Sequence, residues 1–181
     1  MQSPNIKATP CRLSAADYKK DSLCLAPELL GKLLCRKAGT KTVKLRITET
    51  ESYYGEDDTA CHAHKGKTAR TSVMYLEGGH AYIYLCYGVH WLLNIVSGKP
   101  DFPEAVLIRG VEGFDGPGKL TKALSIDKML NGEKLVESKR LWIEDDGEKP
   151  AYKTSKRVGI NYASEEDKNR LWRFVAEGVS Y

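Results

Sequence analysis

Alternation of apolar and polar positions is clearest at residues 42–53, where it predicts a long β-strand. Successive side chains of a strand point to opposite faces. One face therefore carries five alternate residues, namely Leu45, Ile47, Glu49, Glu51 and Tyr53. This face begins apolar and ends in two carboxylates and an aromatic ring, which makes it the first candidate site.

Shorter patterns indicate the other elements of the fold. Short helices are expected from residue 21 or 22 to about 30 and from residue 116 to about 125. Further strands are expected at residues 32–36, 81–87, 91–97, 105–111, 140–144, 155–160 and 171–176. Most connections are too short for the crossovers of a parallel sheet. We therefore expect an α+β fold, a single domain in which short helices flank a curved, mainly antiparallel β-sheet.

The length of 181 residues fits one domain with a real hydrophobic core. Residues 1–20 are expected to be a partly irregular N-terminal extension of this domain, and residues 21–181 its main body. No apolar run reaches the roughly 18–20 residues of a membrane helix. Residues 1–10 lack the basic and apolar regions of a secretory signal. We therefore expect no membrane association.

The five cysteines are odd in number and irregularly spaced, without a Cys-x-x-Cys pair. This favours reduced thiols in an intracellular compartment over a disulfide framework or a structural zinc site. The segment Cys61-His62-Ala63-His64 raises the question of a metal, with His80 or His90 as a further ligand. Its spacing matches no recognised ligand pattern, so we expect no metal.

A net charge of +4 is compatible with a polyanionic partner. Lys65, Lys67 and Arg70 cluster in an expected loop, and Lys119 and Lys122 follow the turn Gly116-Pro117-Gly118. A glycine-rich turn before a helix N-terminus suits one backbone phosphate, although it is not the nucleotide-binding loop pattern. Taken singly, each cluster also fits ordinary solvated surface charge.

Two features suggest chemistry on a nucleobase. Glu49 and Glu51 point the same way, and burial would raise the pKa of at least one carboxyl, as a general base requires. The alternative is an ion-paired or solvated strand end. Tyr82 and Tyr84 share one strand face, and Tyr87 precedes Gly88 at the expected turn. Aromatic rings beside basic loops suit base stacking, whereas the alternative is ordinary packing of a tyrosine-rich strand.

Two motifs are the most specific in the chain, Glu-Thr-Glu-x-Tyr at 49–53 and Tyr-x-Tyr-x-x-Tyr-Gly at 82–88. Together with the segments 25–31, 55–58, 60–62, 106–112, 116–120, 157–160 and 172–174, and in this order, they resemble the alkyladenine (3-methyladenine) DNA glycosylase family. The resemblance runs from about Leu25 to the end of the sequence and includes residues 47–53 and 82–88. It implies a monofunctional enzyme that flips an alkylated or deaminated purine out of duplex DNA and hydrolyses its glycosidic bond.

The resemblance also implies roles for single residues. Glu51 matches the general base that activates water, and Arg109 matches the arginine beside that water and the DNA backbone. The stacking walls for the flipped base match Tyr53, His62 and Tyr84. Tyr87 matches the side chain that wedges into the duplex, and Asn94 a pocket residue that bears on base selectivity. Members similar to this chain use no metal, no cofactor and no lysine nucleophile.

The expected partner is double-stranded DNA with a damaged purine, bound by a monomer. The expected contacts to the DNA backbone are Lys65, Lys67, Arg70, Gly118, Lys119 and Lys122. Because no targeting segment is evident, we expect the cytoplasm of a bacterium, in association with the nucleoid, rather than a nucleus.

One departure from the family pattern keeps alternatives open. Relatives carry a longer, largely helical segment between the Arg-x-x-Glu strand and the Gly-Pro turn, whereas only residues 113–115 lie there in this chain. A catalytically silent damage binder is therefore one alternative. A small-molecule glycosidase or nucleosidase is another, with Glu49 and Glu51 as its acid–base pair. Against it, such i, i+2 side chains lie about 7 Å apart and approach a substrate from one side.

Overall fold

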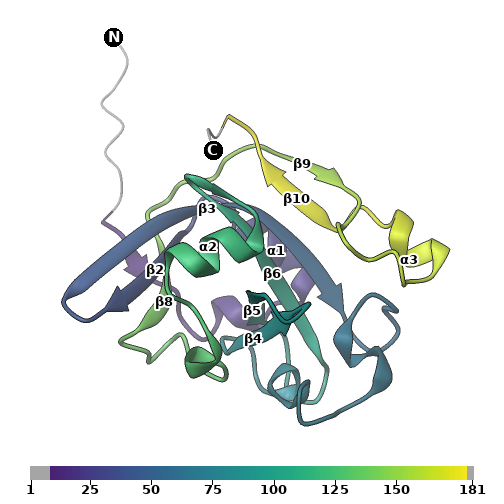
Figure 1. Cartoon of the computed structure of the whole chain (residues 1–181). Helices are drawn as coiled ribbons and strands as arrows, with labels where there is room; N and C mark the ends of the chain where they lie inside the picture. The colour runs from purple at the N-terminus through teal and green to yellow at the C-terminus, as the bar shows by residue number, and fades with distance from the viewer. Residues whose placement is uncertain (1–8, 179–181) are drawn as a thin grey trace.

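The computed structural model describes residues 9–178, whose strands form an antiparallel sheet with few short helices (Figure 1). The strands are β1 (Cys11–Arg12), β2 (Leu33–Ala38), β3 (Lys41–Tyr54), β4 (Ala81–Cys86), β5 (His90–Val96), β6 (Glu104–Val111), β7 (Phe114–Asp115), β8 (Leu141–Asp145), β9 (Tyr152–Ser155) and β10 (Arg173–Ala176). The helices are α1 (Ser22–Glu28), α2 (Pro117–Ala123) and α3 (Glu165–Asn169), and the 3₁₀ turns are η1 (Asp17–Lys19), η2 (His62–Lys65), η3 (Ser72–Tyr75) and η4 (Lys128–Leu130). The expected α+β class and the single domain with a mainly antiparallel sheet are confirmed.

The long strand β3 organises the sheet. The main path runs β1-β8-β2-β3-β6-β5-β4, and β10 leaves it by pairing with β3 and β9. The first half of β3 pairs with β2 and its second half with β10, while β6 follows its other edge. The β3–β6 register is irregular around Glu49, as a bulge makes it. Figure 1 shows β3 as the long curved arrow that links the strands of the main path with β10 and β9. It therefore places its carboxylates where three strands meet.

Short helices close the sheet on its flanks. Asp21 caps α1 by accepting a hydrogen bond from the backbone N–H of Cys24. The Thr50 hydroxyl donates to the Ala26 carbonyl, so α1 covers the face of β3 that carries no glutamate. Pro117 begins α2 at a position where its missing N–H costs nothing, and the Thr121 hydroxyl donates to the Trp91 carbonyl on β5. These contacts leave the glutamate face of β3 free to form a site.

One predicted strand is wrong and one helix was not predicted. The strand expected at 155–160 lies earlier in the chain, as β9, and the residues that follow it are irregular. The Arg157 side chain turns into the protein, and Gly159 has a φ of 77°, which ends an extended path. The short helix α3 follows, with the Ser164 hydroxyl accepting from the backbone N–H of Asp167. This irregular stretch matters below because it borders the site.

The connection between β6 and β7 is a tight hairpin. Val111 of β6 pairs with Phe114 of β7, so only Glu112 and Gly113 form the turn. Gly113 has a φ of 82°, a conformation that glycine adopts at little cost.

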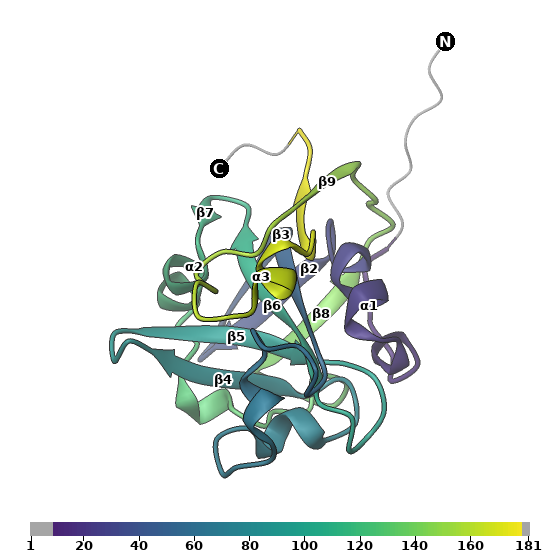
Figure 2. The same ribbon diagram turned by 90° about the vertical axis from the view of Figure 1, so that its right-hand side faces the viewer.

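Figure 2 shows the β4–β5 hairpin reaching to the edge of the molecule, with α2 close by. No helix within residues 9–178 is both long and apolar enough to cross a membrane.

Candidate active site

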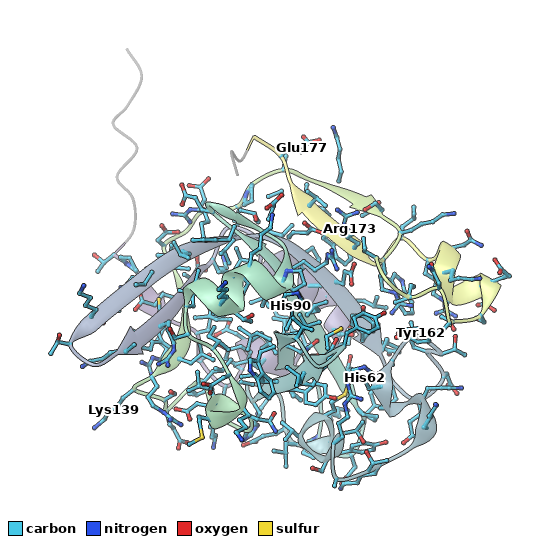
Figure 3. All side chains as sticks on the ribbon, viewed as in Figure 1. His62, His90, Lys139, Tyr162, Arg173 and Glu177 are labelled. Atoms are coloured by element: carbon cyan, nitrogen blue, oxygen red, sulfur yellow. The ribbon has the colours of Figure 1, made fainter. Side chains whose placement is uncertain are left out.

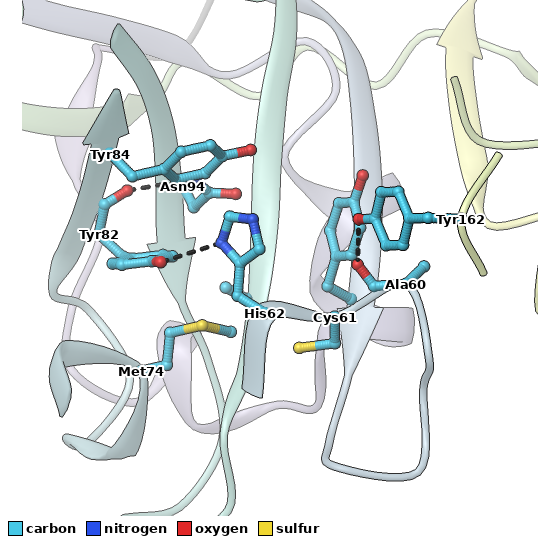
Figure 4. A pocket seen from close by; sticks show the side chains of 10 residues that line it. Ala60, Cys61, His62, Met74, Tyr82, Tyr84, Asn94 and Tyr162 are labelled. Carbon is cyan, nitrogen blue, oxygen red and sulfur yellow. Dashed lines mark hydrogen bonds between the residues drawn. The ribbon is translucent and has the colours of Figure 1, made fainter. Parts of the chain in front are cut away.

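A cavity lined by aromatic side chains opens between β4 and the segments near the end of β3 (Figure 4). Four residues expected to form the base pocket line it together, namely Tyr53, His62, Tyr84 and Asn94. Tyr82, which the sequence placed on the same strand face as Tyr84, lines it as well. The other lining residues were not singled out as pocket residues from the sequence, namely Ala60, Cys61, Met74, Ala105 and Tyr162. The cavity thus draws on residues that lie more than 100 positions apart in the chain.

The rings on one side of the cavity contact one another. His62 and Tyr84 meet edge to face with centroids 4.4 Å apart, and Tyr82 lies 5.6 Å from Tyr84. The His62 Nδ1 is 3.0 Å from the Tyr82 hydroxyl oxygen. Burial lowers the pKa of His62 to about 4, and the positive charge of Arg70 adds to this effect. His62 is therefore neutral near pH 7. Asn94 is buried beside this wall and donates to the Tyr82 carbonyl at 3.1 Å.

Glu51 is the buried carboxylate next to this cavity, with none of its side chain exposed. It accepts hydrogen bonds from the backbone N–H of Val158 at 2.8 Å and from the Tyr53 hydroxyl at 2.9 Å. The Arg109 Nε lies 3.4 Å from the same carboxylate. Burial raises the pKa of Glu51, while Arg109 and the two hydrogen bonds oppose the rise. A carboxylate in this balance is suited to accept a proton.

Glu49 points the same way but is occupied by two arginines. Its Oε1 accepts from the Arg109 Nε at 2.8 Å and from the Arg173 Nε at 2.6 Å. Burial disfavours the charge on Arg109, but Glu51 and Glu49 outweigh it and raise the pKa of Arg109. The alternative of an ion-paired strand end therefore describes Glu49. Glu51 instead has one arginine and two neutral donors.

A buried ion pair lies next to Tyr53 and to the segment that binds Glu51. Arg157 donates to both oxygens of Asp58, at 2.6 and 2.8 Å, and both side chains are almost fully buried. The Arg157 guanidinium also lies 4.9 Å from the Tyr53 ring centroid. The next residue, Val158, supplies the N–H that binds Glu51. Asp58 and Arg157 both fall in the motifs quoted above, yet nothing in the sequence pairs them.

Tyr87, the expected wedge, stands apart from the cavity at the tip of the β4–β5 hairpin. Its side chain is 90% exposed. The Val89 N–H donates to the Cys86 carbonyl at 3.0 Å and closes the turn. Within this turn Tyr87 has a φ of 50° and Gly88 a φ of 71°. Positive φ at two central positions is typical of a type I′ turn, in which glycine, asparagine and aspartate prevail over tyrosine.

The expected backbone-binding residues lie on two separate elements. The Arg70 guanidinium is 5.1 Å from the Tyr84 ring centroid, so it borders the cavity. Lys67 lies 5.1 Å from the Tyr75 ring centroid and 3.8 Å from Asp101. Lys65 is exposed near them.

The others belong to α2. Lys119 pairs with Asp115 at 2.5 Å, and Lys122 is exposed. A Cβ on Gly118 would lie 2.9 Å from the His90 ring, so this glycine allows α2 to pack closely on β5. In residues 9–178, no group of three or more histidine, cysteine, aspartate or glutamate side chains is placed to hold a metal ion. Burial raises the pKa of the Cys61 thiol to about 12, so it stays protonated.

Comparisons with known proteins identify the family of this chain. The profile described as methylpurine-DNA glycosylase matches residues 16–115 and 112–180. The two matches overlap at residues 112–115, which lie at the tight β6–β7 hairpin.

Curated relatives from several bacteria agree with this match. A protein of Psychrobacter cryohalolentis is 40% identical over 87% of this chain and 88% of its own length. Proteins of Borreliella afzelii (43% identical; 91% and 95% covered) and Desulfitobacterium hafniense (41%; 94% and 97%) are similarly related. Each carries the name "Putative 3-methyladenine DNA glycosylase". The chain therefore belongs to the methylpurine-DNA glycosylase family and is a DNA glycosylase, a hydrolase of DNA repair.

Proposed function

We propose that the protein extrudes an alkylated or deaminated purine from duplex DNA and hydrolyses its N-glycosidic bond with a water molecule activated by Glu51. The substrate class is that of 3-methyladenine, 7-methylguanine, hypoxanthine and ethenoadenine. The observation that carries the proposal is the fully buried Glu51 carboxylate, joined to the aromatic cavity through the Tyr53 hydroxyl. A base inside duplex DNA is inaccessible, so an enzyme acting on its glycosidic bond must flip it out.

The chemistry balances with this single carboxylate. Water attacks C1′ of the deoxyribose, its proton passes to Glu51, and the bonding electrons leave with the purine. The products are the free base and an abasic site. The charge of Glu51 also stabilises the oxocarbenium-like sugar, and Arg109 holds Glu51 and the water in register. 3-Methyladenine and 7-methylguanine carry a positive charge in DNA and leave readily. Hypoxanthine and ethenoadenine are neutral and need a proton from elsewhere.

The cavity suits a purine ring, including a cationic one. Stacking contributes about 1–3 kcal/mol per base–aromatic contact. The cavity offers Tyr53, His62 and Tyr84 as walls. Aromatic faces attract cations, and His62, being neutral near pH 7, does not repel them. Asn94, which lines the cavity, is the residue that we expect to distinguish between purines.

DNA would lie across the face that carries the cavity mouth and the tip of the β4–β5 hairpin. Tyr87 is the wedge that fills the gap left by the extruded base. Phosphate contacts come from the loop with Lys65, Lys67 and Arg70 and from α2 with Gly118, Lys119 and Lys122. Contacts of this kind make binding strongly salt-dependent. The occupation of Glu49 by two arginines weakens the alternative of a small-molecule glycosidase with two free carboxyls.

Replacing Glu51 with glutamine tests the proposal. The variant keeps the shape of the side chain but removes the proton acceptor, so base release from a methylated duplex should fall about 10²–10⁴-fold. Abasic sites are scored by alkaline cleavage under single-turnover conditions, and binding to the same duplex is measured by fluorescence anisotropy. Binding should change little.

Glu112→Gln, at an exposed glutamate in the turn after β6, serves as the control. Near-normal release by Glu51→Gln would remove Glu51 from the role of base. If the wild type binds damaged duplex but releases no base, the chain is a silent damage binder.

A further inference from the structure

Tyr162 lies in the irregular stretch between β9 and α3 and lines the aromatic cavity. Figure 4 shows it across the cavity from His62, Tyr82 and Tyr84, and Figure 3 shows it in the whole molecule near His62. Neither a pattern in the sequence nor the family resemblance singled it out. We infer that Tyr162 is a specificity-determining residue, which forms a second wall against the extruded nucleotide and limits the bulk of the base accepted. This inference rests on the proposed function.

The ring of Tyr162 is held in place and yet uncovered. Its hydroxyl donates to the Ala60 carbonyl at 2.8 Å, so the ring has a fixed direction before any ligand binds. The residue is nevertheless 66% exposed. A large aromatic ring that lines a cavity and stays open to solvent gains most by contact with a ligand. Because the hydrogen bond has already fixed the ring, such contact loses little conformational entropy.

The segment beneath Tyr162 is anchored in several ways. Ile160 and Ala163 pack with Ala60 in a small buried apolar cluster. Earlier in the same stretch, Arg157 forms the buried pair with Asp58. The segment therefore acts as a rigid wall, not as a loop that yields to a larger base.

The same stretch also contacts the catalytic carboxylate. The Val158 N–H, four residues before Tyr162, donates to Glu51. A base that displaced Tyr162 would pull on the segment that holds Glu51 in position. A bulky base would thus meet the ring and also disturb the carboxylate. Removing the ring should ease the entry of a larger base while weakening the grip on a smaller one.

The test compares release of hypoxanthine, with two rings, and ethenoadenine, with three, from otherwise identical duplexes. In Tyr162→Ala the single-turnover rate ratio of ethenoadenine to hypoxanthine should rise about tenfold over wild type, a change within the range of base–aromatic contacts. In Tyr162→Phe, which keeps the ring, the ratio should stay within about twofold. Tyr152→Ala removes an exposed tyrosine on β9, outside the cavity, and serves as the control.

The outcomes separate the inference from the function on which it rests. If wild type releases base and Tyr162→Ala leaves the ratio unchanged, the specificity role is overturned and the proposed function stands. Equal losses on both substrates also overturn it, because they indicate a general loss of binding or folding. If wild type releases neither base but does release methylpurines, the proposed function stands, and the inference is overturned unless Tyr162→Ala gains release of ethenoadenine. If wild type releases no base from any damaged duplex, the proposed function fails and the inference falls with it. Circular dichroism melting of each variant reports whether its fold is intact.

Discussion

Two regions of the same sheet, the buried site around Glu51 on β3 and the exposed tip of the β4–β5 hairpin, differ in how far their side chains are buried and held in place. At the centre, Glu51 has no exposed surface and three donors around its carboxylate. At the tip, Tyr87 is 90% exposed in a turn whose backbone conformation disfavours it. The Glu51 carboxylate is therefore buried among protein donors without a ligand, whereas most of the Tyr87 ring contacts solvent.

The difference separates two expected roles, a preorganised catalytic site and a side chain that binds DNA. Catalytic electrostatics work best when they are fixed before the substrate arrives, and a buried network of hydrogen bonds and ion pairs fixes them. A wedge must be free to enter the duplex, so its ring makes its main contacts only in the complex. A strained residue at such a point suggests function. The following variants test this division.

The largest effect on stability is expected from Asp58→Asn. Breaking a buried ion pair leaves an uncompensated charge, in this case that of Arg157, and typically costs about 3–5 kcal/mol. We therefore expect a loss of about 3 kcal/mol in the free energy of unfolding, measured by urea denaturation. The matched control is Asp115→Asn, which breaks the exposed pair with Lys119 and should leave the urea midpoint unchanged. Equal midpoints for the two variants would show that the pair does not hold the centre together.

Tyr87→Gly should separate stability from DNA binding. Affinity for a duplex with a lesion should fall about tenfold, because the proposed wedge is lost. The free energy of unfolding should stay equal or rise by up to about 1 kcal/mol, since glycine adopts positive φ without strain. Binding is measured by anisotropy in a Glu51→Gln background, and unfolding by urea. Met129→Ala, an exposed apolar side chain on η4, is the control. A clear loss of stability in Tyr87→Gly would show that the tyrosine serves the fold.

The sequence predicted regular structure better than it predicted the surroundings of the site. Period-two alternation located β3, although the structure buries residues 47–52 on both of its faces. The resemblance then selected Tyr53, His62, Tyr84 and Asn94, which the structure does bring together around one cavity. Their chemical roles stay predictions. The aromatic strand pattern alone did not distinguish a pocket wall from ordinary packing.

The stretch after β9 was predicted poorly for physical reasons. Asp58 and Arg157 lie 99 positions apart, and no local pattern records that one will bury the other. Val158 acts through its backbone N–H, which every residue except proline possesses, so its identity carries no signal. The expected strand at 155–160 was wrong because the Arg157 side chain is buried inside the protein and the backbone around it is irregular, not extended with alternating faces. Sites built from such segments are visible only in three dimensions.

Glu49→Gln is expected to have the smallest effect and probes how the buried centre is tuned. In the proposed mechanism base release requires ionised Glu51, so the rate should fall as pH drops through the pKa of that carboxyl, which burial raises. The negative charge of Glu49 adds to this rise and also engages Arg109. Without it, Arg109 is freer to pair with Glu51, and both changes lower the pKa of Glu51. The acidic limb of the rate should therefore move to lower pH.

The measurement is the single-turnover rate of base release between about pH 4.5 and 8, in a buffer of constant ionic strength. The rate on the plateau should fall only a few-fold, because Glu51 keeps the Val158 and Tyr53 donors. The Glu112→Gln control should leave the limb in place, since that side chain is exposed in the turn after β6. A limb that stays put, or moves to higher pH, would show that Glu49 positions Arg109 without tuning Glu51. Glu49 would then contribute to the site by holding Arg109 in position and not by changing the pKa of Glu51.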